Sequence, residues 1–454
     1  MRKTIHIILS AAVICSCGCF RPAAHAVHID APADLDRAPS ATQPAPHTGP
    51  AELPVIEPPV GKLTLQKALA LALIHNPQLK SNALDIRIAE ADRLQTSLRP
   101  NPELEFVAEE VGAGRRNALE PGETIIALSQ LVELGGKRQK RIRVSELETR
   151  LAGMDYEARR LDVLTEVHTR FVELLAAQQR VDVMRRIEQL AEKTAATVDA
   201  QVDAGRTSPV EKTRAQIQLS DVRIQRRQAD QNLDAARRTL AKLWAADASF
   251  DEAVGDFETT GLIVSADTMR GWIESNPDIA RWAIEIEQRQ AAIELEKARG
   301  IPDITLGGGV QVFDEPSETA AVFGARIALP LFDANQGGRR AAAYRLARAG
   351  LDSQAARLRI ETRLVTAHRD AANALTRVEE LRDHVLQNAA EVFEAMEEGY
   401  RGGKFEYVDL LDAQRTLFDA RLQYIDALAE YHTARAELER LVGGDVQQDS
   451  SANQ

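Results

Sequence analysis

The sequence is short of aromatic residues, of basic charge and of long apolar runs, and each shortage excludes a class of protein. Aromatic residues make up only 4% of the 454 residues, which is low for an enzyme-like or all-β core. The formal net charge is -12, and an acidic chain is a poor match to a nucleic-acid-binding protein. Beyond the N-terminus, no window approaches the roughly 18 apolar residues of a membrane-spanning helix. If the protein enters a membrane, strands must carry it there.

Residue patterns for catalysis and cofactor binding are missing too. No nucleophile lies in a recognisable arrangement with a base, and no phosphate-binding glycine loop or zinc-ligand spacing occurs. The 9 histidines are scattered, and the 5 methionines form no ladder that could carry copper. The sequence therefore predicts no enzyme, no cofactor and no resident metal ion.

The first 20 residues have the pattern of an export signal. Arg2 and Lys3 precede an apolar run, and all three cysteines of the chain follow that run within residues 15–19. Two processing routes stay open. Either Cys17 (or Cys19) becomes a lipidated N-terminus, or the signal is cleaved after Ala26 and the cysteines are lost. Both routes export the protein.

The two ends of the mature chain carry no helical or strand periodicity. Residues 21–62 are rich in proline and alanine, which predicts an extended tether. Residues 444–454 are short and polar, and we expect them to be a disordered tail.

The remainder of the chain is a two-fold duplication. Landmarks recur in one order at an offset near 200, too long for a small solenoid unit. They are Asn76-Pro77 and Asn276-Pro277, Pro102 and Pro302, Gly135–Arg138 and Gly337–Arg340, and Gly205 and Gly403. The sequence therefore predicts a first repeat at 63–260 and a second at 261–443.

Each repeat contains two alternating segments with the length of a tilted membrane-spanning strand. These segments lie at about 103–111, 122–132, 302–313 and 321–331. Soluble hairpins would show the same alternation. Four strands leave two edges that lipid does not tolerate, so a membrane-embedded sheet must be completed by other copies. Three copies would supply about 12 strands, an even number within the range of bacterial barrels.

Long helices surround these strands. Residues 137–204 would form a helix of roughly 100 Å, and 339–399 one nearly as long. Half-length helices are expected at 63–98, 209–243 and 267–299, with an irregular belt at 244–265. Gly135-Gly136 and Gly337-Gly338 are predicted hinges between strand and helix. The last helix carries a heptad stripe that predicts a helical pair: Leu410, Leu417, Tyr424, Tyr431 and Leu438, followed three positions later by Ala413, Ala420, Ala427, Ala434 and Leu441.

From residue 63 to 443 this arrangement resembles the TolC-like outer membrane factors. The run Val132–Arg138 looks like the signature of their heavy-metal, CzcC-like branch. The resemblance implies a mainly α fold with a membrane β-barrel portion: duplicated long-helix hairpins forming a trimeric α-barrel, and four strands per subunit in a 12-stranded barrel. It also implies a homotrimer in outer-membrane lipid, with the helical tunnel in the periplasm. The implied partners are a periplasmic adaptor protein and an inner-membrane pump, and the implied cargo is divalent heavy-metal cations.

The resemblance also assigns roles to single residues. Asp409 and Asp412, in a run that looks like the start of the helix after the periplasmic tip, would form the pore gate. They are three residues apart and therefore share a helix face, although helix-start carboxylates favoured by the dipole would look the same. Phe405 stands where some members have a basic residue that tethers the gate. Contact with the adaptor falls on the two tip turns, at Gly205, Arg206, Ser208, Gly403 and Lys404.

Two other classes of function compete with a heavy-metal duct. The same architecture could serve the efflux of drugs or other small molecules, or a secretion system. A periplasmic coiled-coil adaptor or a structural coiled coil would also be helical. An adaptor, however, would need a single hairpin and β-rich domains, and a structural coiled coil would lack the duplicated strands.

Overall fold

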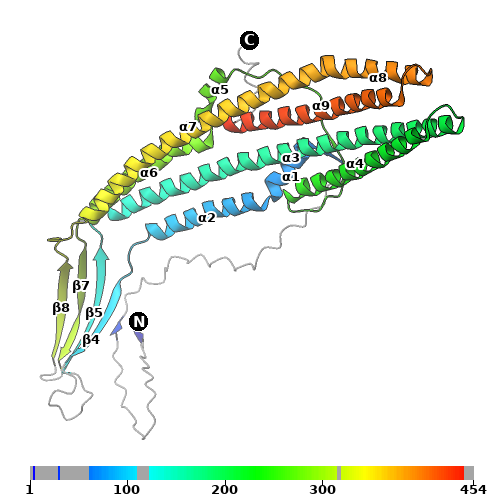
Figure 1. Ribbon diagram of the computed structural model, residues 1–454. Coiled ribbons are helices and arrows are strands. Elements are labelled where there is room, and N and C mark those ends of the chain that lie inside the picture. The colour runs from blue at the N-terminus through cyan, green and yellow to red at the C-terminus, as the bar shows by residue number, and fades with distance from the viewer. Residues whose placement is uncertain (1–3, 6–28, 31–60, 110–121, 314–317, 444–454) are drawn as a thin grey trace, which may run out of the picture. The chain divides into compact units, whose positions relative to one another are not determined.

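The computed structural model describes residues 4–5, 29–30, 61–109, 122–313 and 318–443, and it divides into two units at residues 1–55 and 56–454. In the first unit, β1 (Thr4–Ile5) pairs antiparallel with β2 (Ile29–Asp30). The predicted lipidation at Cys17 or Cys19, the cleavage after Ala26 and the tail at 444–454 lie outside the described residues, as does nearly all of the predicted tether. The second unit holds both repeats (Figure 1).

A four-stranded antiparallel sheet lies at one end of the second unit (Figure 1). Its strands, in the order β4-β5-β7-β8, are β4 (Glu103–Glu109), β5 (Glu123–Val132), β7 (Ile304–Phe313) and β8 (Glu318–Ile327). Each repeat supplies one hairpin, and β5 joins β7 between them. The strand predicted at 321–331 begins three residues earlier and ends at Ile327. Pro330, which has no N–H for a ladder, follows closely, and the Leu331 N–H donates to the Leu329 carbonyl (2.9 Å).

The register gives this sheet one apolar face and one face that carries its charged residues, because side chains alternate along each strand. On the apolar face Leu104 lies opposite Leu128, and Phe106 lies opposite Ile126. The other face carries five carboxylates and one arginine: Glu103, Glu105, Glu109, Glu123, Glu318 and Arg326. The large apolar side chains are exposed on a single chain. Both outer strands, β4 and β8, have a free edge within this sheet.

The helices of the first repeat are α1 (Leu65–His75), α2 (Pro77–Ser97), α3 (Lys137–Asp203) and α4 (Pro209–Lys242). The long and returning helices match the prediction to within a residue at each end. The single helix predicted at 63–98 breaks at Asn76. Its side chain caps α2, and Pro77 occupies the first helical position, where the missing N–H does no harm.

The helices of the second repeat are α5 (Ala266–Trp272), η1 (Ile273–Ser275), α6 (Pro277–Arg299), α7 (Gln336–Glu380), η2 (Leu381–Val385), α8 (Leu386–Arg401) and α9 (Tyr407–Val442). An Asn-Pro break again divides the incoming helix, here at Asn276. The long helix predicted at 339–399 is one continuous rod with a single π-helical turn, η2, inside it.

Two groups of packed helices follow one another along the second unit, one next to the sheet and one at the tips. Next to the sheet, α3 packs against α2 and α6, and α6 packs against α7. Towards the tips, α3 packs against α4 and α9, and α9 packs against α8 (Figure 1). The predicted heptad stripe of α9 is confirmed, since eight of its ten residues are buried and Tyr424 and Ala434 are half-buried.

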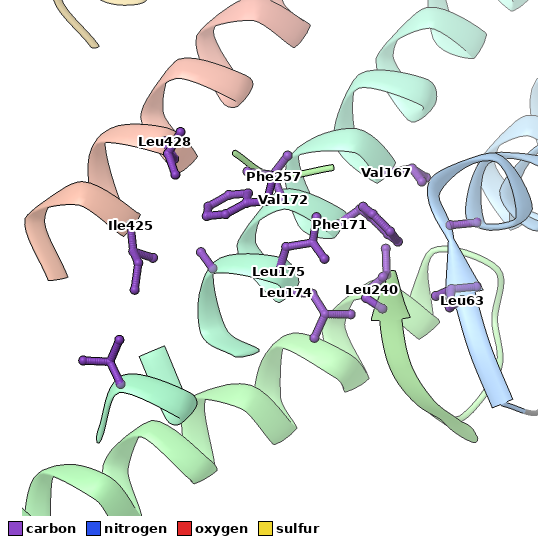
Figure 2. Packing of buried hydrophobic residues seen from close by; sticks show 14 of the residues in the cluster. Leu63, Val167, Phe171, Val172, Leu174, Leu175, Leu240, Phe257, Ile425 and Leu428 are labelled. Carbon is purple, nitrogen blue, oxygen red and sulfur yellow. The ribbon is translucent and has the colours of Figure 1, made fainter. Parts of the chain in front are cut away.

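The belt between the repeats is more ordered than the predicted irregular segment. It contains β6 (Phe250–Val254), which pairs in parallel with β3 (Gly61–Thr64) at the start of the first repeat. The pair covers a core in which Phe171 and Leu240 lie beside Leu63 (Figure 2). Sequence reasoning missed this pairing because its strands are four and five residues long and almost 190 residues apart.

None of the helices in the described part of the chain is long and apolar enough to cross a membrane.

Candidate functional site

The two tip turns have the same backbone geometry. Gly205 and Gly403 follow the ends of α3 and α8 with φ values of +68° and +71°, which side-chain-bearing residues rarely adopt. The next N–H in each turn, from Arg206 or Lys404, donates 2.8 Å back to the carbonyl of Gln201 or Gly399. This is the Schellman pattern, which satisfies the last carbonyls of a helix. The glycines are therefore explained by turn geometry.

The returning helices begin with different caps. Ser208 accepts a hydrogen bond from the Val210 N–H (3.3 Å) and is followed by Pro209 at the first helical position. Glu406 caps α9 in a reciprocal box, in which the Asp409 carboxylate accepts the Glu406 N–H at 3.1 Å. Asp409, predicted to be a gate residue, therefore also has a local structural role.

The tips of the two repeats pack against each other. A buried cluster of Val198, Ala215, Tyr400, Tyr407 and Leu410 joins α3 and α4 to α8 and α9. The Tyr400 hydroxyl donates to Gln201 Oε1 across the repeats (2.9 Å). Burial, with Tyr400 and Glu211 nearby, raises the pKa of Tyr407 to about 12. Sequence reasoning missed this tyrosine pair, whose signal was two aromatics flanking one glycine turn in a chain with few aromatics.

The exposed surface of the tips includes basic and apolar residues. Arg206 and Lys404 are both exposed, as the prediction of a contact surface requires. Val210, Phe405 and Val408 are exposed beside them. The Phe405 ring lies against Gly399, where a methyl group would overlap it. One side of the Phe405 ring therefore packs against α8, and the side chain remains 40% exposed.

Asp409 and Asp412 lie together on an exposed face of α9. They line a groove of about 400 Å³ between α8 and α9, with Val385, Val392 and Met396 on its other wall. The π-turn η2 ends in this groove at Val385. The structure therefore brings the two predicted gate residues to one surface beside an irregularity in the opposing helix.

The first strand-to-helix junction is built by the run Val132–Arg138. Gly135 and Gly136 both have left-handed φ values, +69° and +68°, so the predicted hinge is correct there. A methyl group on Gly135 would come within 2.7 Å of Ile301 Cδ1. The Leu134 N–H and the buried Lys137 ammonium both bind Asp303 Oδ1, at 2.9 and 2.8 Å. These motif residues hold the junction closed.

At the second junction the predicted glycine hinge was wrong. Gly337 and Gly338 lie in the first turn of α7, and the left-handed position is taken by Asn335 at φ +58°. The Asn335 amide donates to the Glu296 backbone carbonyl (2.9 Å) and to Glu296 Oε2 (2.6 Å). Gly338 is needed for another reason, since a methyl group there would lie 2.7 Å from Glu296 Oε2. Asparagine tolerates this backbone conformation better than most residues.

The repeated Asn-Pro landmarks join helix ends, a role that sequence reasoning did not assign. Asn276 Oδ1 accepts the Asp278 N–H (2.8 Å), and Asn276 Nδ2 donates to the carbonyls of Arg440 and Leu441 at 3.0 and 2.9 Å. In the first repeat, Asn76 Nδ2 donates to the Leu243 carbonyl at 2.8 Å. Each amide therefore caps the start of one helix and the end of another.

Two histidines lie close together beside the belt. His432 bonds to the Phe257 carbonyl through Nε2 (2.9 Å), and burial lowers its pKa. Burial, with His432 and Arg435 as neighbours, lowers the pKa of His168 to about 4. Both rings are therefore neutral at pH 7. Within the described residues, no group of three or more His, Cys, Asp or Glu side chains is placed to hold a metal ion.

Comparison with known proteins identifies close relatives over most of the chain. Residues 68–246 and 271–444 match the family described as outer membrane efflux protein. The cobalt-zinc-cadmium resistance protein CzcC of Cupriavidus metallidurans is 31% identical over 87% of this chain and 94% of its own length. The nickel-cobalt-cadmium resistance protein NccC of Alcaligenes xylosoxydans is 26% identical over 71% of each chain.

The fold is also found among solved structures. The outer membrane protein VceC of Vibrio cholerae superposes with a TM-score of 0.71 over 84% of this chain and 97% of its own, at 18% identity.

Proposed function

This chain belongs to the outer membrane efflux protein family, and we propose that it forms the exit duct of a pump that exports divalent heavy-metal cations. The observation that supports the duct is the build of the second unit. Its four-stranded sheet has one apolar face and continues into two successive groups of packed helices. The duct is passive, and the energy for transport comes from an inner-membrane pump. The cargo class is supported by the resistance proteins CzcC and NccC, whose names specify cobalt, zinc, nickel and cadmium.

The wall of the duct is closed by three copies of the chain, so that β4 of one copy pairs with β8 of the next in a barrel of about 12 strands. The helices at the two sides of the unit support this closure, because α7 on one side and α1 with α2 on the other each carry an apolar stripe that is not covered within the chain. Four residues of α7 at heptad spacing are more than half exposed, as are four on α1 and α2. They are Tyr344, Leu351, Leu358 and Val365, and Ile74, Leu84, Ile88 and Leu94.

The two stripes match in height as well as in chemistry. Along the helix axes, Leu351 and Leu84 each lie roughly 20 Å from the strand junctions. Near the tips, α4 exposes Val210, Ile217 and Ile224, also at heptad spacing, and α8 exposes Val392. Head-to-tail contacts of this kind close into a ring when the rotation between copies is right.

A cysteine pair tests the closure. The native cysteines all precede residue 20, so Leu351→Cys with Leu84→Cys adds the only thiols to the rest of the chain. Oxidation should give cross-linked species up to three chains, and the control pair Leu351→Cys with Asn82→Cys should cross-link less. A stable folded monomer in detergent would refute the trimer.

The two tips contact the periplasmic adaptor through their exposed basic and apolar residues. Arg206 and Lys404 are exposed on an otherwise acidic chain, and Gly205, Gly403 and Ser208 fix the two turns that present them. Substituting both arginine and lysine by glutamate should abolish metal resistance while leaving the amount of protein in the outer membrane unchanged. Unchanged resistance would place the adaptor contact on another surface.

Asp409 and Asp412 form the gate. Both carboxylates are exposed on one face of α9, and three copies would form rings of like charge that attract cations. Because Asp409 also caps α9, alanine would remove the cap, worth about 1 kcal/mol, together with the charge. Asparagine keeps an acceptor and removes only the charge. Asp409→Asn with Asp412→Asn should raise single-channel conductance and weaken block by multivalent cations. If conductance and block were unchanged, the two carboxylates would only stabilise the start of the helix and the gate would lie elsewhere.

Deletion of the gene tests the cargo. The deletion strain should become sensitive to one or more of zinc, cobalt, cadmium, nickel and copper, and the intact gene should restore resistance. A strain that becomes sensitive only to organic drugs or detergents would refute the metal cargo and favour small-molecule efflux.

A further inference from the structure

The two strand-to-helix junctions differ in what they expose. At the first, Leu134 is half-buried, and Lys137 is buried against Asp303. At the second, the segment 328–335 presents Leu329, Leu331 and Phe332, which are 69%, 77% and 92% exposed. The first junction is packed within the chain, whereas the second exposes apolar side chains. The second junction therefore needs a neighbour outside the chain that the first does not need.

The exposed segment has a defined conformation. The Gln336 amide donates to the Phe332 carbonyl (2.9 Å), and Gln336 Oε1 accepts the Ala334 N–H (2.9 Å). The Asp333 carboxylate accepts the Asn335 N–H at 2.9 Å. These bonds form a tight bend, so Phe332 is held outward by the backbone around it.

The basic residues that follow the two junctions differ in the same way. After the first junction, Arg138 donates to the Ser97 carbonyl (2.6 Å) and Lys137 is paired. After the second, Arg339 and Arg340 are exposed and make no side-chain hydrogen bond or ion pair to any described residue. Two free guanidinium groups therefore stand directly beyond the exposed apolar bend.

We propose that Leu329, Leu331 and Phe332 enter the periplasmic leaflet of the outer membrane and that Arg339 and Arg340 bind anionic phospholipid headgroups there. The inference rests on the proposed duct, which places the sheet in that membrane. In the sequence, Leu329 and Leu331 keep the two-residue spacing of Phe323, Ala325 and Ile327, and the bend follows directly after the apolar face of β8.

The distances along α7 favour these two arginines over the next two. The headgroup layer on each side of a bilayer is about 5–8 Å thick. Arg340 lies roughly 6 Å along the helix from its start, within that layer, whereas Arg345 and Arg348 lie roughly 14–18 Å along it, beyond the layer. Arg345 and Arg348 are thus a control pair on the same helix, although Arg348 is paired with Asp352 (3.3 Å).

Fluorescence quenching tests the position of the bend. Full-length Phe332→Trp protein is reconstituted into phosphatidylcholine vesicles with brominated acyl chains. The control is Tyr344→Trp, about 12 Å along α7 in the stripe that faces the neighbouring copy. Only the tryptophan at 332 should be quenched beyond the background of the three native tryptophans. An unquenched tryptophan at 332, as expected if a neighbouring copy covers the bend, would overturn the inference.

Competition between lipids tests the arginines. Quenching of the same tryptophan by brominated phosphatidylglycerol in unbrominated phosphatidylcholine gives the relative affinity for the anionic lipid. A lysine or arginine near an anionic surface contributes about 1 kcal/mol, so Arg339→Gln with Arg340→Gln, which removes two, should lower this preference roughly 30-fold. Arg345→Gln with Arg348→Gln should leave it within about twofold. Equal effects of the two pairs would overturn the headgroup contact.

Conductance recorded from the same preparations separates the inference from the proposed function. Normal channels with an unquenched tryptophan refute the lipid contact alone. A quenched tryptophan in vesicles without channels supports the lipid contact and refutes the duct.

Discussion

The amide of Asn276 should control how firmly the second repeat is closed at its Asn-Pro break. This side chain is fully buried and makes three hydrogen bonds, one to the start of α6 and two to the end of α9. Each of these hydrogen bonds contributes about 1 kcal/mol to stability, and the N-cap bond to the start of α6 is one of the three. Asn276→Ala should therefore lower the local free energy of opening by about 3 kcal/mol.

The assay is hydrogen exchange measured by mass spectrometry on the intact assembly. A loss of 3 kcal/mol corresponds to exchange that is roughly 100-fold faster in peptides spanning 276–282 and 438–443, if opening there limits exchange. Asn76→Ala should act in the same way at the first repeat, on peptides near residues 77 and 243. Asn82→Ala, whose amide makes one bond within α2 (3.3 Å), is the control and should change exchange less than threefold.

A second variant separates the two functions of the amide. Asn276→Asp keeps an acceptor for the Asp278 N–H but replaces the donor with an oxygen that faces two carbonyl oxygens. Exchange should rise strongly at the end of α9 and little at the start of α6. If Asn276→Ala left both peptides within threefold of the unmodified protein, the amide would not join these helix ends, and the reasoning would fail.

Three further predictions follow from the junctions, the histidines and the second tip. Gly136→Ala should destabilise the protein by about 1–2 kcal/mol because φ at this position is +68°. Gly337→Ala lies inside α7 and should stabilise the protein by up to about 1 kcal/mol. Thermal unfolding of both variants tests the corrected position of the hinge. The pKa of His168 is lowered from 6.5 to about 4, so the unfolded chain binds the proton more readily, and stability should fall as pH drops from 6.5 to 4 by at most roughly 3 kcal/mol per chain. His168→Gln should flatten that dependence, and an unchanged pH profile would contradict the shift. Gly399→Ala should reduce metal resistance by displacing Phe405, and Phe405→Ala added to it should relieve the overlap, as growth assays on both strains would reveal.

Much of the fold could be predicted because its signals are local. The ends of α3 and α4 follow from glycine and proline at the turns, and the α9 stripe follows from heptad spacing. The errors arose where a local signal had two causes. Gly337-Gly338 resembled the hinge of the first repeat, but the backbone turns at Asn335, and Gly338 instead makes room for the contact between Asn335 and Glu296.

The candidate site divides in the same way. The tip glycines and the Asp409–Asp412 pair were visible as sequence patterns, because turns and helix faces depend on neighbours in the chain. The capping role of Asp409 was visible only as an alternative until the Glu406 N–H was located 3.1 Å from its carboxylate. The contact of the tyrosine pair with the first repeat could not be assigned, since Tyr400 and Gln201 are almost 200 residues apart.

Local patterns in the chain are enough to show that two repeats exist, that each contains a hairpin between long helices, and where most helices begin and end. Periodicity and the backbone limits of glycine and proline act over a few residues, so they are readable without a structure. Three contacts became visible only in the folded protein: β5 pairs with β7 across the repeats, β6 pairs with β3, and Lys137 is buried against Asp303. Such contacts join residues far apart in the chain, and their geometry depends on how whole helices and strands pack against one another.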